Sequence, residues 1–235
     1  MNIDLLQNFD GVILDPFPHL IIKDALPEEV YEELENTIPE DEIKNNAIFN
    51  KSANMYRYKC AQALNNEGLP SIWKEIFEYH TSKKFFSNSI SLFKKQFISI
   101  HDISSYMDIL NSKIGIRNFD DVGTNYYTDC QYAINNPMSD GETHLLQHVD
   151  SSQEIYAGLL YMRKDEDKSS GGGLLIYDKE EVVKTIPYRR NVFVMFLNTG
   201  VSSHGVEPRI GAEIKRYTIN IIGEFNINTN YRRMY

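Results

Sequence analysis

Cysteine is scarce in this sequence, with only Cys60 and Cys130 among 235 residues. Two cysteines allow one bridge at most, which excludes the disulfide framework of a small secreted protein. Long hydrophobic runs are also missing, because the longest clean run, Val192–Leu197, falls far short of the ~20 residues that a membrane span needs. The N-terminus shows neither a basic segment nor a long apolar one. We therefore expect no signal peptide, no membrane association and a reducing, cytoplasmic location.

Positive charge is in short supply as well. The chain has 24 Lys and Arg against 33 Asp and Glu, a formal net charge of −9. This balance argues against a non-specific nucleic-acid binder, which needs a positive field. At 42% hydrophobic and 12% aromatic residues, the chain is too apolar to be disordered. We expect a globular protein that does not bind nucleic acid, with the oligomeric state left open.

The first half of the sequence is mixed. Residues 18–22 form a short β-prone run, and a helix begins at Pro27, with Val30, Leu34 and Ile38 on one apolar stripe. A second helix begins at Pro70, and residues 82–116 are partly helical. No repeat is visible.

The texture changes after about residue 125, where β-branched and aromatic runs alternate with turn clusters. Eight such strands at regular spacing fit a jelly roll, against one side of which the helices would pack. The expected fold is mainly β, one domain over 1–235, in which 1–125 give helical and strand support and 126–226 form the core. The predicted strands are 126–135, 144–149, 156–162, 173–178, 181–187, 191–197, 202–207 and 215–225.

One short motif has the residue types of a metal site. His148 and Asp150 are separated by one residue, so on a strand both side chains would project from the same face. With His204 as a third ligand they would form the facial triad of a ferrous site, which leaves coordination positions open. The spacing alone is weak evidence, because a surface histidine beside an acid gives the same pattern.

Arg216 strengthens the metal hypothesis. It lies 12 residues after His204 at the start of an apolar strand, where an unpaired guanidinium is costly. A carboxylate ligand would pair with it bidentately, and Thr218 would point the same way. An internal ion pair with a protein acid is the alternative.

The order of His-x-Asp, His and Arg-x-Thr, each on a strand, resembles the Fe(II)/2-oxoglutarate-dependent oxygenase superfamily, prolyl-4-hydroxylase-like branch. Residues 16–27 resemble the opening strand and helix of that branch, and residues 130–225 resemble its core. Residues 40–125 show no such resemblance, and we expect that they contribute to the choice of substrate. The stretches that carry the core resemblance are 159–162, 172–177, 187–196, 204–208 and 216–219.

This resemblance implies a double-stranded β-helix that uses Fe(II), 2-oxoglutarate and O2. His148, Asp150 and His204 would be the metal ligands and the catalytic centre. Arg216 would bind the distal carboxylate of 2-oxoglutarate, helped by Thr218, Tyr161 and, matching less well, Tyr132. The implied reaction is hydroxylation of an unactivated C–H bond of a small metabolite, amino acid or protein side chain, with succinate and CO2 as co-products. Asp150 favours hydroxylation, because halogenating relatives have Gly or Ala there.

Two alternatives stay open at this point. One is a non-catalytic jelly-roll protein that binds a metal or ligand. The other is a cupin-like metalloenzyme that does not use 2-oxoglutarate, although cupins usually present more histidines together with a Glu. Desaturation or ring closure in place of hydroxylation is also open.

Overall fold

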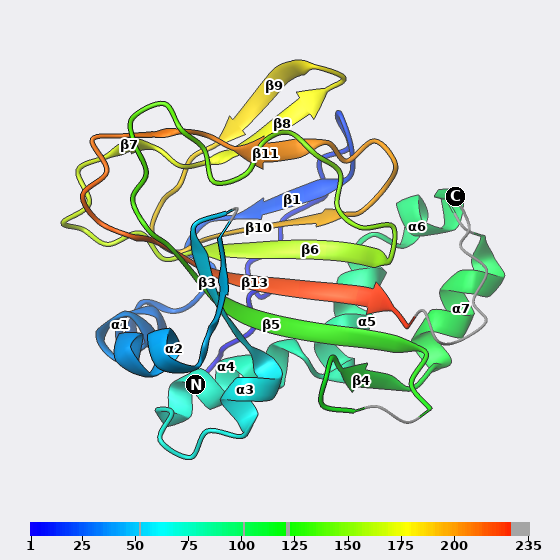
Figure 1. The fold of residues 1–235 in the computed structure, drawn as a ribbon. Helices are drawn as coiled ribbons and strands as arrows, with labels where there is room; N and C mark the ends of the chain where they lie inside the picture. Colours follow the sequence, from blue (N-terminus) through cyan, green and yellow to red (C-terminus); the bar gives the residue numbers. More distant parts are fainter. Residues whose placement is uncertain (52, 101, 121–122, 227–235) are drawn as a thin grey trace.

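The computed structural model describes residues 1–51, 53–100, 102–120 and 123–226. A large eight-stranded sheet runs through its middle (Figure 1). Its neighbouring strands are antiparallel, except for the short β4, which lies parallel to β5. In spatial order the strands are β1 (His19–Ile22), β10 (Val192–Leu197), β6 (Glu154–Tyr161), β13 (Arg216–Phe225), β5 (Tyr126–Asn135), β3 (Met55–Lys59) and β2 (Ile48–Asn50), with β4 (Ile114–Ile116) beside β5.

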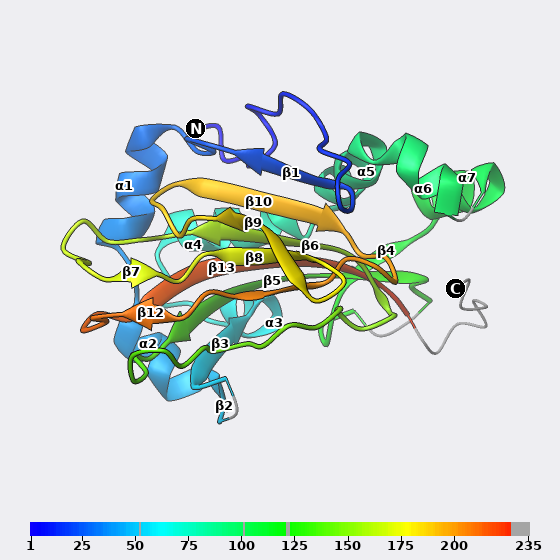
Figure 2. The same ribbon diagram turned by 90° about the horizontal axis from the view of Figure 1, so that it is seen from above.

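A smaller three-stranded sheet faces the large one, and a two-stranded ribbon extends this layer (Figure 2). The long strands of the large sheet and the short strands of the small sheet together enclose the jelly-roll interior. In spatial order the small sheet is β11 (His204–Val206), β8 (Leu174–Asp178) and β9 (Glu181–Ile186), and the ribbon pairs β12 (Arg209–Ile210) with β7 (Ser170–Gly171).

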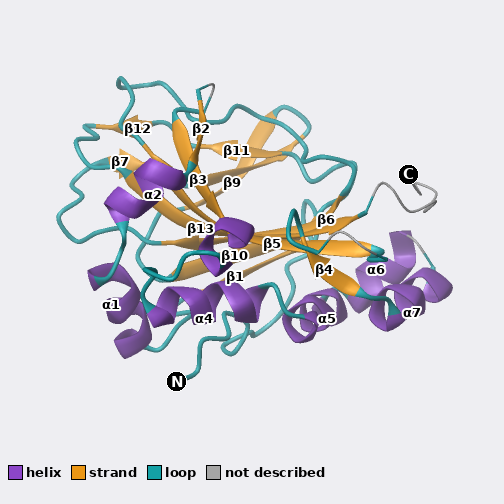
Figure 3. Ribbon diagram, turned by 60° about the horizontal axis from the view of Figure 1, so that its bottom comes forward, coloured by secondary structure: helices purple, strands orange, loops and turns teal. Residues whose placement is uncertain are grey.

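The helices gather on the other side of the large sheet (Figure 3). They bury a continuous hydrophobic cluster against it, to which α1 contributes Leu34, α4 contributes Trp73 and β6 contributes Leu160. None of the helices in the described ranges is long and apolar enough to cross a membrane. The helices are α1 (Glu28–Asn36), α2 (Glu40–Asn46), α3 (Cys60–Leu64), α4 (Ser71–His80), α5 (Lys83–Leu92), α6 (Lys94–Ile100) and α7 (Ile103–Asn111).

A second apolar cluster lies between the two sheets. Strands β6 and β10 contribute Tyr161 and Phe196 from the large sheet, and β8 contributes Ile176 from the small one. Alternate residues of β6 therefore face different cores: Leu160 packs toward the helices and Tyr161 toward the small sheet. The predicted mainly β jelly roll with helices on one sheet is confirmed.

Two local features differ from the predictions. Residues 144–149 do not form a continuous strand: His148 makes an isolated bridge with His204, and both Leu145 and Leu146 are exposed. Without alternate burial, nothing holds this segment in a regular strand. The hairpin of β2 and β3 was not predicted at all. Its strands are short, and β3 is stabilised by pairing with β5 rather than by its own sequence pattern.

Candidate active site

His148, Asp150 and His204 meet at one end of the jelly-roll interior. One potential ligand atom from each lies within 4.8 Å of the others. His148 Nε2 is 3.4 Å from Asp150 Oδ1, and His204 Nε2 is 3.7 Å from Asp150 Oδ2. The backbone bridge between the two histidines, with both N–H···O distances at 2.9 Å, brings their rings together. The structure thus unites residues that are 56 positions apart in sequence.

Both imidazole rings are oriented by the backbone. His148 Nδ1 lies 2.8 Å from the carbonyl oxygen of Leu146, and His204 Nδ1 lies 2.9 Å from that of Ser202. A carbonyl only accepts, so each Nδ1 carries the proton and each Nε2 presents a lone pair toward Asp150. Two imidazole nitrogens and one carboxylate on one side of a centre form the donor set of a ferrous facial triad.

The electrostatics of this cluster follow from burial and proximity. The pKa of His148 is raised because its protonated ring would donate a hydrogen bond to Asp150, whereas burial lowers the pKa of His204. Burial alone would raise the pKa of Asp150, but the two histidines and Arg57 together hold it below its usual range. The carboxylate is therefore ionised near neutral pH, as a metal ligand must be.

Arg216 is buried at the other end of the same interior, 4% exposed. Its Nε donates to the carbonyl of Gly172 at 2.9 Å, and its Nη1 donates to Asn135 Oδ1 at 3.3 Å. No carboxylate of the described residues forms an ion pair with this guanidinium. The equally buried Arg209, by contrast, pairs with Asp167 at 2.8 Å. The internal ion pair considered as an alternative for Arg216 is absent from the described part of the chain.

Thr218 and Tyr161 lie beside Arg216. They are directly opposite each other on β13 and β6, and the Arg216 Cζ is 5.2 Å from the centre of the Tyr161 ring. The Tyr161 hydroxyl is buried without a hydrogen-bond partner. Burial raises the pKa of Tyr161, and the Arg216 charge partly offsets this effect. A guanidinium and an unpaired buried hydroxyl in one place indicate a position for an anionic ligand group.

One cavity of about 540 Å³ connects the histidine cluster with Arg216. This volume is in the range of small-molecule sites. Strands β5, β6 and β13 form one wall and β8 and β11 another, and the third side is the segment that carries His144 and His148. The cavity is thus lined by two imidazoles and a carboxylate in one part and by a guanidinium in another. His144, whose Nδ1 is 3.2 Å from the carbonyl of Ala53, also lines it.

Tyr132 does not reach the cavity. Its ring packs against Trp73, with centroids 4.8 Å apart, and stacks on Tyr217 at 6.2 Å, on the helix side of β5. Its neighbours Gln131 and Ala133 point the opposite way because side chains alternate along a strand. The predicted role of Tyr132 in binding 2-oxoglutarate is thus not supported, and we leave it out of the site.

Sequence reasoning missed several polar residues that line the cavity, among them Arg57, Gln131, Glu154 and Asn220. Asn220 continues the alternation of Arg216 and Thr218 along β13, so that pattern would have identified it. Gln131 is opposite Asn220 on β5, a pairing that only the register reveals. Burial and the nearby Asp150 raise the pKa of Glu154 to about 7.

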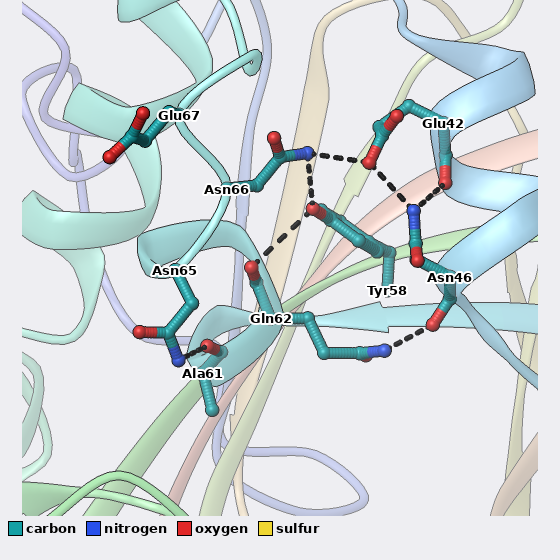
Figure 4. A pocket seen from close by; sticks show the side chains of 8 residues that line it. All are labelled: Glu42, Asn46, Tyr58, Ala61, Gln62, Asn65, Asn66 and Glu67. Atoms are coloured by element: carbon teal, nitrogen blue, oxygen red, sulfur yellow. Dashed lines mark hydrogen bonds between the residues drawn. The ribbon is translucent and has the colours of Figure 1, made fainter.

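A second hollow, of about 560 Å³, lies outside the jelly roll where α2, β3 and α3 meet (Figure 4). Its polar groups bind one another: Asn66 Nδ2 donates to Glu42 Oε1 and to the Tyr58 hydroxyl, each at 2.9 Å. Asn46 Nδ2 donates to the same Glu42 oxygen at 2.6 Å. Since these groups are mutually satisfied, this hollow is a packing feature rather than a candidate site.

The comparisons with known proteins agree with this geometry. Residues 131–222 match the family model of the 2OG-Fe(II) oxygenase superfamily. This range contains all the predicted site residues. The match covers less than half of the chain, but it spans the whole site, and together with the His/Asp/His geometry it supports a dioxygenase that depends on Fe(II) and 2-oxoglutarate. No curated protein matches the sequence.

Solved structures share the fold at low sequence identity. A Pseudomonas putida prolyl-4-hydroxylase is 12% identical with a TM-score of 0.56, and the alignment covers 91% of this chain and 95% of that one. A Trichoplax adhaerens prolyl hydroxylase is 15% identical with a TM-score of 0.52 and coverages of 95% and 88%. The Arabidopsis thaliana dioxygenase for auxin oxidation 1, bound to 2-oxoglutarate, is 13% identical with a TM-score of 0.56 and coverages of 90% and 84%.

Proposed function

We propose that this dioxygenase hydroxylates an unactivated C–H bond of a small metabolite, amino acid or protein side chain, with succinate and CO2 as co-products. In this proposal His148, Asp150 and His204 hold the iron. Arg216 binds the distal carboxylate of 2-oxoglutarate, assisted by Thr218 and Tyr161. Residues 126–226 would form the core of one oxygenase domain, supported by residues 1–125.

The observation that carries the proposal is the unpaired state of Arg216. A buried guanidinium without a carboxylate is unfavourable, whereas the adjacent Arg209 has its own aspartate. The missing carboxylate fits a ligand that reaches the histidine cluster through the same cavity. A metal-binding protein without a co-substrate gives no reason for Arg216, and the same holds for a cupin-like enzyme that does not use 2-oxoglutarate.

The residues present fit both cofactors. The two Nε2 atoms and the ionised Asp150 match the ferrous donor set. The Tyr161 hydroxyl, which has no hydrogen-bond partner, lies near the Arg216 guanidinium that would bind the carboxylate of 2-oxoglutarate. When bound, Fe(II) with 2-oxoglutarate supplies the oxidising chemistry. The chain orients the histidines through Leu146 and Ser202 and surrounds the reacting groups with the walls of the cavity.

An anaerobic titration with Fe(II) and 2-oxoglutarate tests this function. We expect a weak visible charge-transfer band that needs both additions. The band should vanish in His148→Ala, because a ligand is lost. In Arg216→Ala it should require at least tenfold more 2-oxoglutarate, since a charge-assisted pair contributes roughly 1.5–3 kcal/mol. Arg189→Ala, in which an exposed arginine outside the cavity is removed, is the control.

Absence of the band in the folded, iron-loaded parent would refute the proposal and favour the non-catalytic binding protein. Equal 2-oxoglutarate requirements for the parent and Arg216→Ala would refute the assigned role of Arg216 while leaving the iron ligands in place.

A further inference from the structure

The cavity has unpaired charges near Asp150 as well as at Arg216. Arg57, on β3, lines the cavity, and its Nε is buried without an acceptor. Glu154, at the start of β6, lines it too. Within the described ranges neither side chain takes part in an ion pair, although each feels the other's charge. One guanidinium and one carboxyl group of this cavity therefore lack close partners.

Two amide oxygens that line the same cavity also lack partners. Gln131 and Asn220 are directly opposite each other on β5 and β13, and their side-chain oxygens are buried without a donor. The Gln131 amide is oriented by its NH2 group, which donates to Asp129 Oδ2 at 2.6 Å. Asp129 is itself held by Arg117 at 2.7 Å. Because the NH2 group points to Asp129, the Gln131 side-chain oxygen points away from Asp129 and is free to accept a hydrogen bond.

These four groups are complementary to one kind of ligand. A guanidinium binds a carboxylate through two parallel hydrogen bonds. An ammonium group has three donors, and the Glu154 carboxylate with the oxygens of Gln131 and Asn220 offers three acceptor groups. Since buried polar groups are normally paired, a ligand that brings one carboxylate and one ammonium would satisfy the whole set.

We propose that Arg57, Glu154, Gln131 and Asn220 form the substrate subsite and that the substrate is a free α-amino acid. Arg57 would bind its carboxylate, and Glu154 with the two amide oxygens would bind its ammonium group. This inference rests on the proposed function, because subsite and cofactor residues line the same cavity. A residue within a peptide has neither free group, so a protein substrate would leave this subsite unpaired.

Calorimetry on the holoprotein tests the proposal. The enzyme is loaded with Mn(II) and 2-oxoglutarate without oxygen and titrated with each free L-amino acid. We expect at least one to bind. Its N-acetyl derivative and its carboxamide should each bind at least tenfold more weakly, because each lacks one of the two charges.

Two variants assign the two ends of the substrate. In Arg57→Gln the free amino acid should bind at least tenfold more weakly, and the discrimination against the carboxamide should disappear. In Glu154→Gln the discrimination against the N-acetyl derivative should disappear instead. The affinity of the Mn(II)-loaded protein for 2-oxoglutarate should stay within twofold in both variants, and Arg189→Gln, at an exposed position outside the cavity, should resemble the parent in every titration.

The possible failures are distinguishable. If the parent binds 2-oxoglutarate but no free amino acid, the subsite proposal is overturned and the proposed function stands. If Arg57→Gln weakens 2-oxoglutarate binding tenfold, Arg57 belongs to the co-substrate and the proposal is again overturned. If the metal-loaded parent does not bind 2-oxoglutarate, both proposals are overturned.

Discussion

At the scale of single residues, two tyrosines show how position decides role. Tyr132 and Tyr161 are both completely buried strand residues, and each has a hydroxyl without a hydrogen-bond partner. Tyr132 packs on Trp73 in the helix layer, whereas Tyr161 faces Arg216 inside the jelly roll. A carboxylate bound by Arg216 would therefore lie near Tyr161 and not near Tyr132. The two residues therefore form a matched pair for experiment.

We expect Tyr161→Phe to weaken 2-oxoglutarate binding three- to tenfold, because the variant loses one hydrogen bond of roughly 1 kcal/mol. Tyr132→Phe should leave the affinity within twofold of the parent. Anaerobic titration of the Mn(II)-loaded proteins measures both. A larger effect for Tyr132→Phe than for Tyr161→Phe would contradict the assignment of these two hydroxyls.

At the scale of elements, the connection from β7 to β8 holds Arg216 in place. The Gly172 carbonyl accepts from the Arg216 Nε, and the segment lies close to the chain before β12. Gly171 has φ +77°, and a Cβ there would be 2.0 Å from the carbonyl oxygen of Pro208. Glycine is therefore required at this position for two reasons, backbone conformation and close approach.

Three Gly→Ala variants separate these two reasons. Gly200 has open space and an ordinary φ, so its replacement should change the free energy of unfolding by less than about 0.5 kcal/mol. Gly211 has φ +66° but open space, so its replacement should cost about 1–2 kcal/mol.

Gly171→Ala should cost more than either and should also weaken 2-oxoglutarate binding through the displaced Gly172 carbonyl. Urea denaturation and anaerobic titration measure the two effects. A cost for Gly171→Ala no larger than that for Gly211→Ala would show that the contact with Pro208 yields easily.

At the scale of the whole molecule, the helix layer buries a titratable group. His80, at the end of α4, is fully buried; its Nδ1 donates to the Ile76 carbonyl at 2.8 Å and its Nε2 accepts from the Leu5 N–H at 3.4 Å. Burial lowers its pKa from 6.5 to about 4. Between these two values the unfolded chain holds a proton that the folded protein does not.

His80 should therefore make the free energy of unfolding fall as the pH drops from 6.5 to 4, by up to roughly 3 kcal/mol. Above pH 6.5 its contribution should be constant. Urea denaturation as a function of pH tests this, with a shallower slope expected in His80→Leu. An NMR titration of the His80 imidazole with a midpoint near 6.5 would contradict the expectation without any variant.

Much of the fold was predictable because its strands carry strong local signals. Strand β5 coincides with its predicted range, and β10 and β13 differ from theirs by one residue. Their runs of branched and aromatic residues are bounded by turn formers. The β2–β3 hairpin was missed because its stability comes from pairing with β5, and a non-local contact leaves little trace in the local pattern.

The sequence by itself determined the jelly roll with helices on one sheet and the candidate site residues His148, Asp150, His204 and Arg216. Residue spacing and hydrophobic alternation are local properties, so they can be read along the chain. Only the tertiary structure decided which polar groups lack partners and which side chains share the cavity. Strand register placed Gln131 opposite Asn220 on the cavity side of β5 and Tyr132 on the helix side. A shift of β5 by one residue would have placed Tyr132 on the cavity side and Gln131 on the helix side.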